Sequence, residues 1–515
     1  MSAAAAATGP GEFAVRHRGA ITVSIMLATI MQALDTTIAN VALPHMQGSL
    51  GAAQDQVSWV LTSYIVAAAI ATPLTGWLTG RLGRKRLFLV SVTGFTVASM
   101  LCGLAQSLEQ MVVFRLLQGV FGAALVPLSQ AVLLDINPRE NHGKAMAIWG
   151  AGIMVGPILG PTLGGWLTDN FDWRWVFYIN LPVGLLALGG IAAFVAETPR
   201  KLDQYFDILG FTLLALAIGA FQMMLDRGQH KDWFGSSEIV IEAAVAGIAF
   251  YMFLAHSATT ARPFFRPGLF RDANLMAGNC FVFVIGVILF ATMALLPPLM
   301  QSLLDYPVVT AGMMLAPRGM GTMAAMMIVG RLVGRVDTRI LLASGFLLIA
   351  FSLWQMTQLL SLQMDWSPFI WTGVVQGVGI GLVYVPLSAA TFATLDPELR
   401  GDGTALFSLL RNIGSSVGIS FVETMLSRNT QTMHEDLGGH ITALNPLAAL
   451  PPAGNPGLTT ALAALNGEVS RQAAMVAYVD DFKLMMLMTL AVVPLIVLLR
   501  PSRKAPSADH AAVME

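Results

Sequence analysis

Charged side chains are scarce in this sequence of 515 residues, because Asp, Glu, Lys and Arg together make up only 11% of it. Soluble domains carry about 25% charged residues. Hydrophobic residues instead make up 55% of the chain, and long apolar runs recur from Ile21 to Leu499. This composition excludes an ordinary soluble protein and indicates an all-helical integral membrane protein that crosses the bilayer many times.

Cysteine is also nearly absent, with only Cys102 and Cys280, each inside an apolar run. Such cysteines are typical of small buried hydrophobic residues rather than of a disulfide or a metal pair. The eight histidines are scattered, and no group of His, Cys and carboxylates has metal-ligand spacing. A membrane-embedded enzyme would need such a cluster. We therefore expect no enzyme, no metal, no cofactor and no nucleic-acid partner.

Apolar runs of about 20 residues, the length that crosses a bilayer as a helix, predict fourteen transmembrane spans. The first run has no small-residue cleavage site, so we interpret it as a span and not as a signal peptide. The spans are expected near residues 21–43, 57–79, 87–105, 111–134, 144–167, 175–196, 207–225, 237–256, 275–300, 310–330, 340–360, 367–394, 403–425 and 482–499.

The distribution of Lys and Arg predicts the orientation of these spans. With the N-terminus in the cytoplasm, twenty of the 29 cations fall in cytoplasmic segments and five on the opposite side. This is a strong form of the positive-inside bias of membrane proteins. We therefore expect both termini in the cytoplasm, which requires an even number of spans.

An internal repeat relates the two ends of the chain. Gln118-Gly119 followed by Pro127 in the fourth span matches Gln376-Gly377 followed by Pro386 in the twelfth, with a second proline 11 residues after each. The matching glutamines are 258 positions apart, a shift of eight spans that preserves direction. The repeat predicts two pseudo-symmetric six-helix bundles, at residues 1–200 and 272–515, with two additional helices and linkers at 201–271.

The first span contains a carboxylate, Asp35, within the stretch LDTTIANVALP at Leu34–Pro44. A charge at the centre of a span costs about 2.5–3.5 kcal/mol, so such residues are usually functional. Two interpretations remain open. Asp35 is either a structural acid held by Thr, Asn or Arg neighbours, or a proton carrier whose ionisation depends on how close an arginine lies.

The fourth span contains an arginine, in the stretch RLLQGVFG. Arg115, Gln118, Gly119 and Gly122 share one helix face, because their spacing is i, i+3, i+4 and i+7. Arg115 either extends along the helix toward the membrane surface or forms the partner of a buried carboxylate. We favour the second interpretation and expect Asp35 and Arg115 to act as a proton-coupling pair.

The fifth span, GAGIMVGPILGPTLGG, places a glycine on one face at every turn. These glycines form a groove that a neighbouring helix can enter closely, and the adjacent prolines introduce kinks. Packing by small residues is common in membrane helices, but four glycines in register with two prolines form a more specific pattern. The positions assigned to this helix are Gly152, Gly156, Pro157, Gly160 and Gly164.

The segment GWLTGRLGRKR is expected to be a cytoplasmic loop between the second and third spans. Its glycines permit a tight turn, and its cations suit the anionic headgroup region. It is either an ordinary positive loop or a gate. The positions assigned to the gate are Gly76, Arg81, Gly83, Arg84 and Arg86. Polar residues inside spans are expected to line a substrate cavity between the bundles, and they are Asn40, Gln118, Gln376 and Arg318.

These motifs resemble those of the major facilitator superfamily. The Gly76–Arg86 segment is similar to its cytoplasmic latch, although Gly80 stands where that pattern usually has an acid. The Arg115 stretch is similar to its proton-coupling arginine motif, and the glycine helix to the antiporter motif of drug:proton exchangers. With LDTTIANVALP and fourteen spans, the sequence resembles the fourteen-span drug:proton antiporter family. Leu225–Phe234 and the long loop at about 427–481 resemble its EmrB type.

The resemblance implies a proton-driven exporter of amphipathic toxic compounds in the bacterial inner membrane, working by alternating access. The proton gradient would supply the energy, with no cofactor. The EmrB type also implies a periplasmic adaptor and an outer-membrane channel as partners, contacted by the 427–481 loop through a helical piece at Leu458–Tyr478. A plain periplasmic excursion is the alternative for that loop. For the whole chain, the alternative is a uniporter or a proton symporter for a metabolite.

Overall fold

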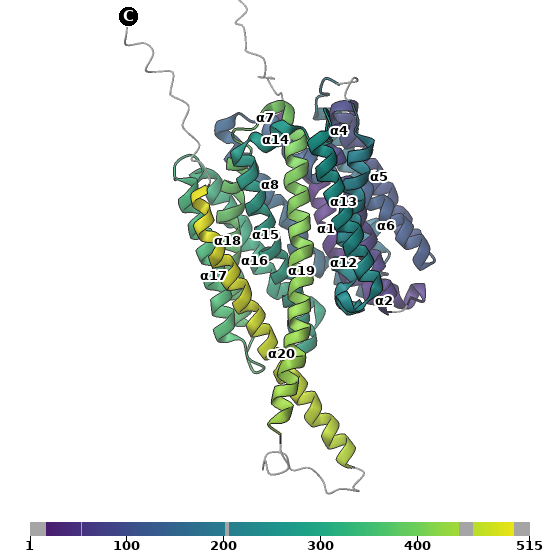
Figure 1. Ribbon diagram of the computed structural model, residues 1–515, viewed down its shortest axis with the longest axis vertical. Helices are drawn as coiled ribbons and strands as arrows, with labels where there is room; N and C mark the ends of the chain where they lie inside the picture. The colour runs from purple at the N-terminus through teal and green to yellow at the C-terminus, as the bar shows by residue number, and fades with distance from the viewer. Residues whose placement is uncertain (1–16, 53, 201–204, 442–456, 499–515) are drawn as a thin grey trace, which may run out of the picture.

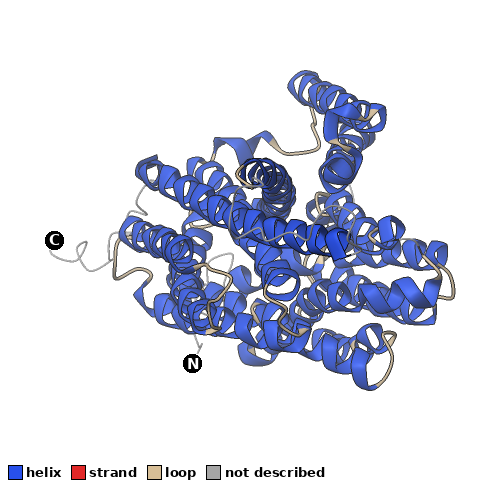
Figure 2. Ribbon diagram, turned by 90° about the horizontal axis from the view of Figure 1, so that it is seen from below, coloured by secondary structure: helices blue, strands red, loops and turns tan. Residues whose placement is uncertain are grey.

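The computed structural model describes residues 17–52, 54–200, 205–441 and 457–498. These residues form a bundle of helices joined by loops, without a strand in the described part (Figure 2). The helices of the first part are α1 (Arg18–Leu50), α2 (Gln54–Val57), α3 (Trp59–Ala71), α4 (Leu74–Leu82), α5 (Arg84–Leu104), α6 (Leu108–Gly122), α7 (Leu125–Ile136), α8 (His142–Ile153), α9 (Val155–Asn170), α10 (Trp175–Tyr178) and α11 (Asn180–Phe194). Those that follow are α12 (Ile208–Gly228), α13 (Ser237–Thr259), α14 (Pro267–Arg271), α15 (Ala273–Pro298), α16 (Val308–Leu332), α17 (Thr338–Leu359), α18 (Ser367–Thr391), α19 (Arg400–Gly439) and α20 (Gly457–Val492).

Eleven helices of the described chain are long and apolar enough to cross a membrane, or twelve if α3 and α4, bent by 59°, form one span. Fourteen spans were predicted, and that number is not confirmed. The other two predicted spans coincide with α16 and α20, which are helical but are not among these eleven. Both chain ends were predicted to be cytoplasmic, and their residues, 1–16 and 499–515, lie outside the described residues.

Proline explains where the spans of the first part are broken into two helices. Pro127 and Pro157 each lie three residues after the residue at which the helix breaks, Ala124 and Met154, and Pro73 lies in the break between α3 and α4 itself. Proline has no amide hydrogen to donate to the carbonyl four residues earlier, and its ring clashes with that carbonyl. The break between α8 and α9 at Met154 is therefore set by Pro157.

The predicted loop at Gly76–Arg86 was wrong in extent. α4 continues to Leu82 and α5 begins at Arg84, so Gly83 alone makes the turn. Its φ of 84° lies in the left-handed region that glycine adopts without strain. We call the end of the bundle that holds this turn the basic end; it is at the top of Figure 1, beside α4 and α7.

The two parts of the chain use the same close helix packing. In the first part α1 lies against glycines of α9, and in the second α15 lies against Gly414 and Gly418 of α19. Small residues allow this approach because no side chain separates the backbones. α12 packs against α13 and also contacts α19 (Figure 1). Gln222 of α12 donates to Ser416 of α19 at 2.7 Å, while Thr62 of α3 donates to Asp226 of α12.

Candidate functional site

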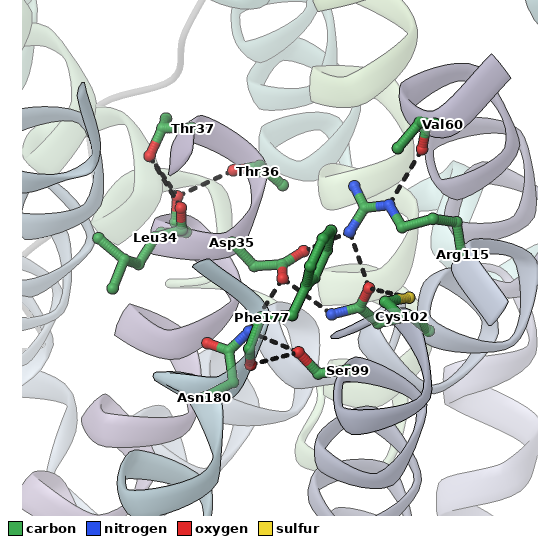
Figure 3. A network of polar contacts seen from close by, with 12 residues as sticks. Leu34, Asp35, Thr36, Thr37, Val60, Ser99, Cys102, Arg115, Phe177 and Asn180 are labelled. Carbon is green, nitrogen blue, oxygen red and sulfur yellow. Dashed lines mark hydrogen bonds and ion pairs between the residues drawn. The ribbon is translucent and has the colours of Figure 1, made fainter. Parts of the chain in front are cut away.

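Asp35 and Arg115 meet inside the first part of the bundle, as their spacing and charge predicted. Asp35, on α1, is completely buried, and its Oδ2 lies 2.8 Å from Nη1 of Arg115 on α6. Its Oδ1 accepts hydrogen bonds from Nε2 of Gln118 at 2.8 Å and Nδ2 of Asn180 at 2.9 Å (Figure 3). Three donors from two other helices therefore hold one carboxylate.

Arg115 is fixed from several sides. Its Nε donates to the carbonyl of Val60 on α3 at 3.0 Å, and Nη1 also donates to Oε1 of Gln118 at 2.7 Å. The guanidinium lies over the ring of Tyr64, 4.4 Å from the centroid, which is a favourable cation–π distance. The arginine does not extend toward the membrane surface, because its side chain is only 1% exposed.

Asn180 is a member of this network that the sequence did not single out. It begins α11, 145 residues after Asp35, and its amide also donates to Ser99 of α5 at 2.9 Å. Its only signal in the sequence is a polar residue near the start of the sixth apolar run. The network thus joins α1, α3, α5, α6 and α11.

The glycine groove of the fifth span is filled by the helix that carries Asp35. A side chain added at Gly156 would lie 2.6 Å from the backbone of Ala33, and one at Gly164 2.7 Å from Ile38. Thr37 donates to the carbonyl of Gly156 at 3.1 Å. Gly160 faces Thr37, whereas Gly152 faces the end of the Met26 side chain.

The opposite face of the same span contacts the second part of the chain. Gly312 and Gly319 of α16 lie against Pro161 and Ile158 of α9. The helix formed by α8 and α9 is therefore placed between α1 and α16.

At the basic end a pair of salt bridges, which we call the relay, connects the first part of the chain to the second. Asp135 at the end of α7 pairs with Arg84, and its Oδ1 lies 2.6 Å from Nη1 of Arg400 on α19. Arg84 was assigned to the gate, but its partner could not be predicted from the sequence. One carboxylate thus pairs with a cation from α5 and a cation from α19, and it joins the first part of the chain to the second at this end.

The remaining gate residues surround the relay. Gly76 lies against Asp402 of α19, which pairs with Arg266 at 3.4 Å. Arg86 pairs with Glu197 at 3.6 Å, and a side chain at Gly83 would meet the same Glu197. Arg81 lies over the ring of Trp77 at 5.7 Å. Although Gly80 supplies no acid, Asp135 and Asp402 supply two from other helices.

The four residues expected to line a substrate cavity lie in three places. Gln118 belongs to the Asp35 network, and Asn40 is exposed on α1. Gln376 and Arg318 are both buried in the second bundle, where they line the same two small cavities. A shared substrate cavity for all four remains a prediction.

The segment before the last span is a helical hairpin made by the ends of α19 and α20, which project below the other helices in Figure 1. The helix expected at Leu458–Tyr478 is confirmed as part of α20. His434 of α19 and Asn466 of α20 lie 3.1 Å apart and tie the two arms together. Residues 442–456 of the expected loop lie outside the described residues.

Comparison with known proteins gives consistent results. A sequence model of the Major Facilitator Superfamily matches residues 25–419. The chain is 37% identical to the multidrug export protein EmrB of Haemophilus influenzae, over 83% of this chain and 84% of that protein. It is 35% identical to EmrB of Escherichia coli K12 over the same shares. It is 34% identical to the fatty acid resistance protein FarB of Neisseria gonorrhoeae, over 95% and 97%.

Solved structures show the same fold at low identity. The human organic anion transporter MFSD10 matches with a TM-score of 0.58 and 15% identity, covering 91% of this chain and 99% of that one. The proton:xylose symporter XylE matches with a TM-score of 0.58 and 13% identity, covering 93% and 98%. At these identities the likeness concerns the arrangement of helices and leaves the cargo open.

Proposed function

We propose that this chain, which belongs to the major facilitator superfamily and is a multidrug exporter of the EmrB type, drives export with protons through Asp35 and Arg115. The chain is a multi-pass protein of the inner membrane, and it is a transporter and not an enzyme. The observation that carries the coupling proposal is the buried ion pair at 2.8 Å, fully enclosed between helices.

The chemistry follows from the charge balance of the pair. Protonation of Asp35 would remove its negative charge and leave Arg115 buried without a counter-charge. Breaking a buried pair in this way costs about 3–5 kcal/mol, enough to favour a different arrangement of α1 and α6. Release of the proton would restore the pair and the first arrangement. One proton would thus be exchanged against one change of conformation.

The packing supports a route from the pair to the substrate path. α1 carries Asp35 and lies in the glycine groove of α9, and α9 contacts α16 of the other bundle. We propose that the two bundles rock about this contact, in a 6+2+6 arrangement of fourteen spans with α12 and α13 as the added pair. The basic end would face the cytoplasm together with both termini, and Asp135 would close it in one state.

The cargo is proposed to be amphipathic and toxic, as the names of the relatives suggest, with Asn40, Gln118, Gln376 and Arg318 on its path. We further propose that the α19–α20 hairpin projects into the periplasm and contacts an adaptor protein, which connects the exporter to an outer-membrane channel. The length of the hairpin and the many exposed residues on its arms support such a contact.

The coupling proposal is tested in everted membrane vesicles that have been acidified inside. Adding a drug to wild-type vesicles should release protons, measured as recovery of a quenched pH-sensitive dye. Asp35→Asn keeps the size of the side chain but cannot be charged, so drug-dependent proton release should be lost. Glu109→Gln, which removes an exposed acid at the start of α6, should behave as wild type. Full proton release in the Asp35 variant would refute the assignment, and a proton flux in the same direction as the drug would indicate a symporter.

A further inference from the structure

We propose that the second bundle holds a small monovalent anion beside Arg318, at a site separate from the Asp35 network. Arg318 lies in the middle of α16 and is only 7% exposed. Its backbone packs against Gly373 and Gly377 of α18, and its side chain crosses to α15, where Nη2 donates to the carbonyl of Leu289 at 3.3 Å. The guanidinium is therefore enclosed by the bundle.

The charge of Arg318 has no counterpart in the protein. No acid of the described residues lies within ion-pair distance of it, and its Nη1 is buried without a hydrogen-bond partner. An isolated buried cation is among the most costly features that a protein interior can contain. Arg115 and Arg400, which are also buried, show how the chain solves this problem elsewhere, because Asp35 and Asp135 pair with them.

The internal repeat identifies what is missing. In the first bundle Gln118 donates to the carboxylate of Asp35 on α1. Its repeat partner, Gln376, instead points its Nε2 toward the hydroxyl of Thr292 on α15, at 3.4 Å. The position of Arg115 is taken by Gly373, against which Arg318 of the neighbouring helix α16 packs. The second bundle therefore has the glutamine and an arginine from another helix, with no carboxylate in the cavities that they line. An anion at this place would supply the negative charge that Asp35 supplies in the first bundle.

A cavity lies at the required position. Arg318 and Gln376 line it together with three hydroxyl side chains, Thr292, Ser352 and Thr372, and with no acid. The hydroxyls of Ser352 and Thr372 already donate to backbone carbonyls, at 2.7 and 2.6 Å. Nη1 of Arg318 and the second amide hydrogen of Gln376 are thus the donors that remain for a ligand.

The size of the cavity limits the ligand. Its volume of about 10 Å³ is close to the room that one water molecule needs. The rest of its wall is apolar and includes Phe369, Phe482 and Met314. A halide is slightly larger than a water molecule and needs only the flexible Met314 side chain to shift, whereas the carboxylate of a fatty acid would bring a tail for which this cavity has no room in the present conformation. We therefore assign the site to a halide such as chloride.

The test measures thermal unfolding of the purified full-length protein in detergent, at constant ionic strength with gluconate as the replacement anion. Chloride and bromide should each raise Tm by about 2 °C, saturating with concentration, because ligands that bind only the folded state stabilise it. Arg318→Met should be insensitive to halide. Arg411→Met, which removes an arginine that donates to the hydroxyl of Tyr384, should keep the response.

Several outcomes would overturn the proposal. A wild-type Tm that is the same in gluconate and chloride would do so, as would an equal halide response in Arg318→Met. If octanoate raised Tm and chloride did not, the group bound by Arg318 would be an organic carboxylate. Should Arg318→Met fail to fold, bromide-soaked crystals of the wild type give an independent answer, since the proposal requires anomalous density beside Nη1.

Discussion

Replacing Gly156 by alanine should displace the helix that carries Asp35. The new Cβ would lie 2.6 Å from the Ala33 carbonyl carbon, and ordinary contact begins at 3.4 Å, so α1 and α9 must separate by about 0.8 Å. Overpacking of this kind costs about 1–3 kcal/mol. The separation also stretches the hydrogen bond from Thr37 to the Gly156 carbonyl, now 3.1 Å, which contributes about 1 kcal/mol.

Whether a Gly→Ala substitution raises or lowers Tm shows if the glycine is needed for packing. Alanine is the better helix former by about 0.5–1 kcal/mol, so without a steric conflict Tm should not fall. At Gly189 of α11, where nothing lies within 4 Å, Gly189→Ala should leave Tm unchanged or raise it. Gly152→Ala meets only the flexible end of Met26 and should cost little. Gly156→Ala should instead lower Tm by several degrees and reduce drug-dependent proton release.

The assay is thermal unfolding of the three purified variants in the same detergent, followed by the vesicle experiment. The reasoning fails if Gly156→Ala is as stable and as active as Gly189→Ala, because the close approach of α1 would then be unnecessary. If Gly156→Ala is less stable but releases as many protons per molecule of folded protein as the wild type, the groove serves folding and not coupling.

Two further predictions concern the ends of the bundle. Asp135→Asn should open the basic end, because it leaves Arg84 and Arg400 without their shared acid. Since Asp135 is 25% exposed, we expect the closed arrangement to lose about 1–3 kcal/mol of stability. Thiol labelling of a cysteine introduced at position 401 should then become roughly tenfold faster. Replacing the outer hairpin at 430–468 by a short linker should abolish capture of a tagged adaptor protein while drug uptake into everted vesicles continues.

Both predictions have matched controls. Glu197→Gln removes an acid whose ion pair, within the described residues, is with the well-exposed Arg86. Labelling at position 401 should therefore stay at the wild-type rate, measured in a background without the two native cysteines. Unchanged labelling in Asp135→Asn would show that the relay does not hold the end closed. If the variant with the shortened hairpin still captured the adaptor normally, the surface that binds the adaptor would lie elsewhere on the protein.

Much of the candidate site could be predicted from the sequence because it depends on local periodicity. The i, i+3 spacing of Arg115 and Gln118 fixes them on one face of a helix whatever else surrounds it. The four-residue repeat of Gly152, Gly156, Gly160 and Gly164 fixes a groove in the same way. The cost of a charge in a membrane made Asp35 conspicuous before any contact was known.

Only the tertiary structure decided which helices meet. The groove has no preference in its own sequence for α1, and Asn180 reaches Asp35 across 145 residues. Asp135 lies at a helix end, where an acid is ordinary, until Arg84 and Arg400 converge on it. The side chains that share a face of each helix follow from the sequence alone, because an α-helix has a fixed number of residues per turn. Which faces come together depends on packing between distant segments, and only the folded chain decides whether a charge such as that of Arg318 finds a partner.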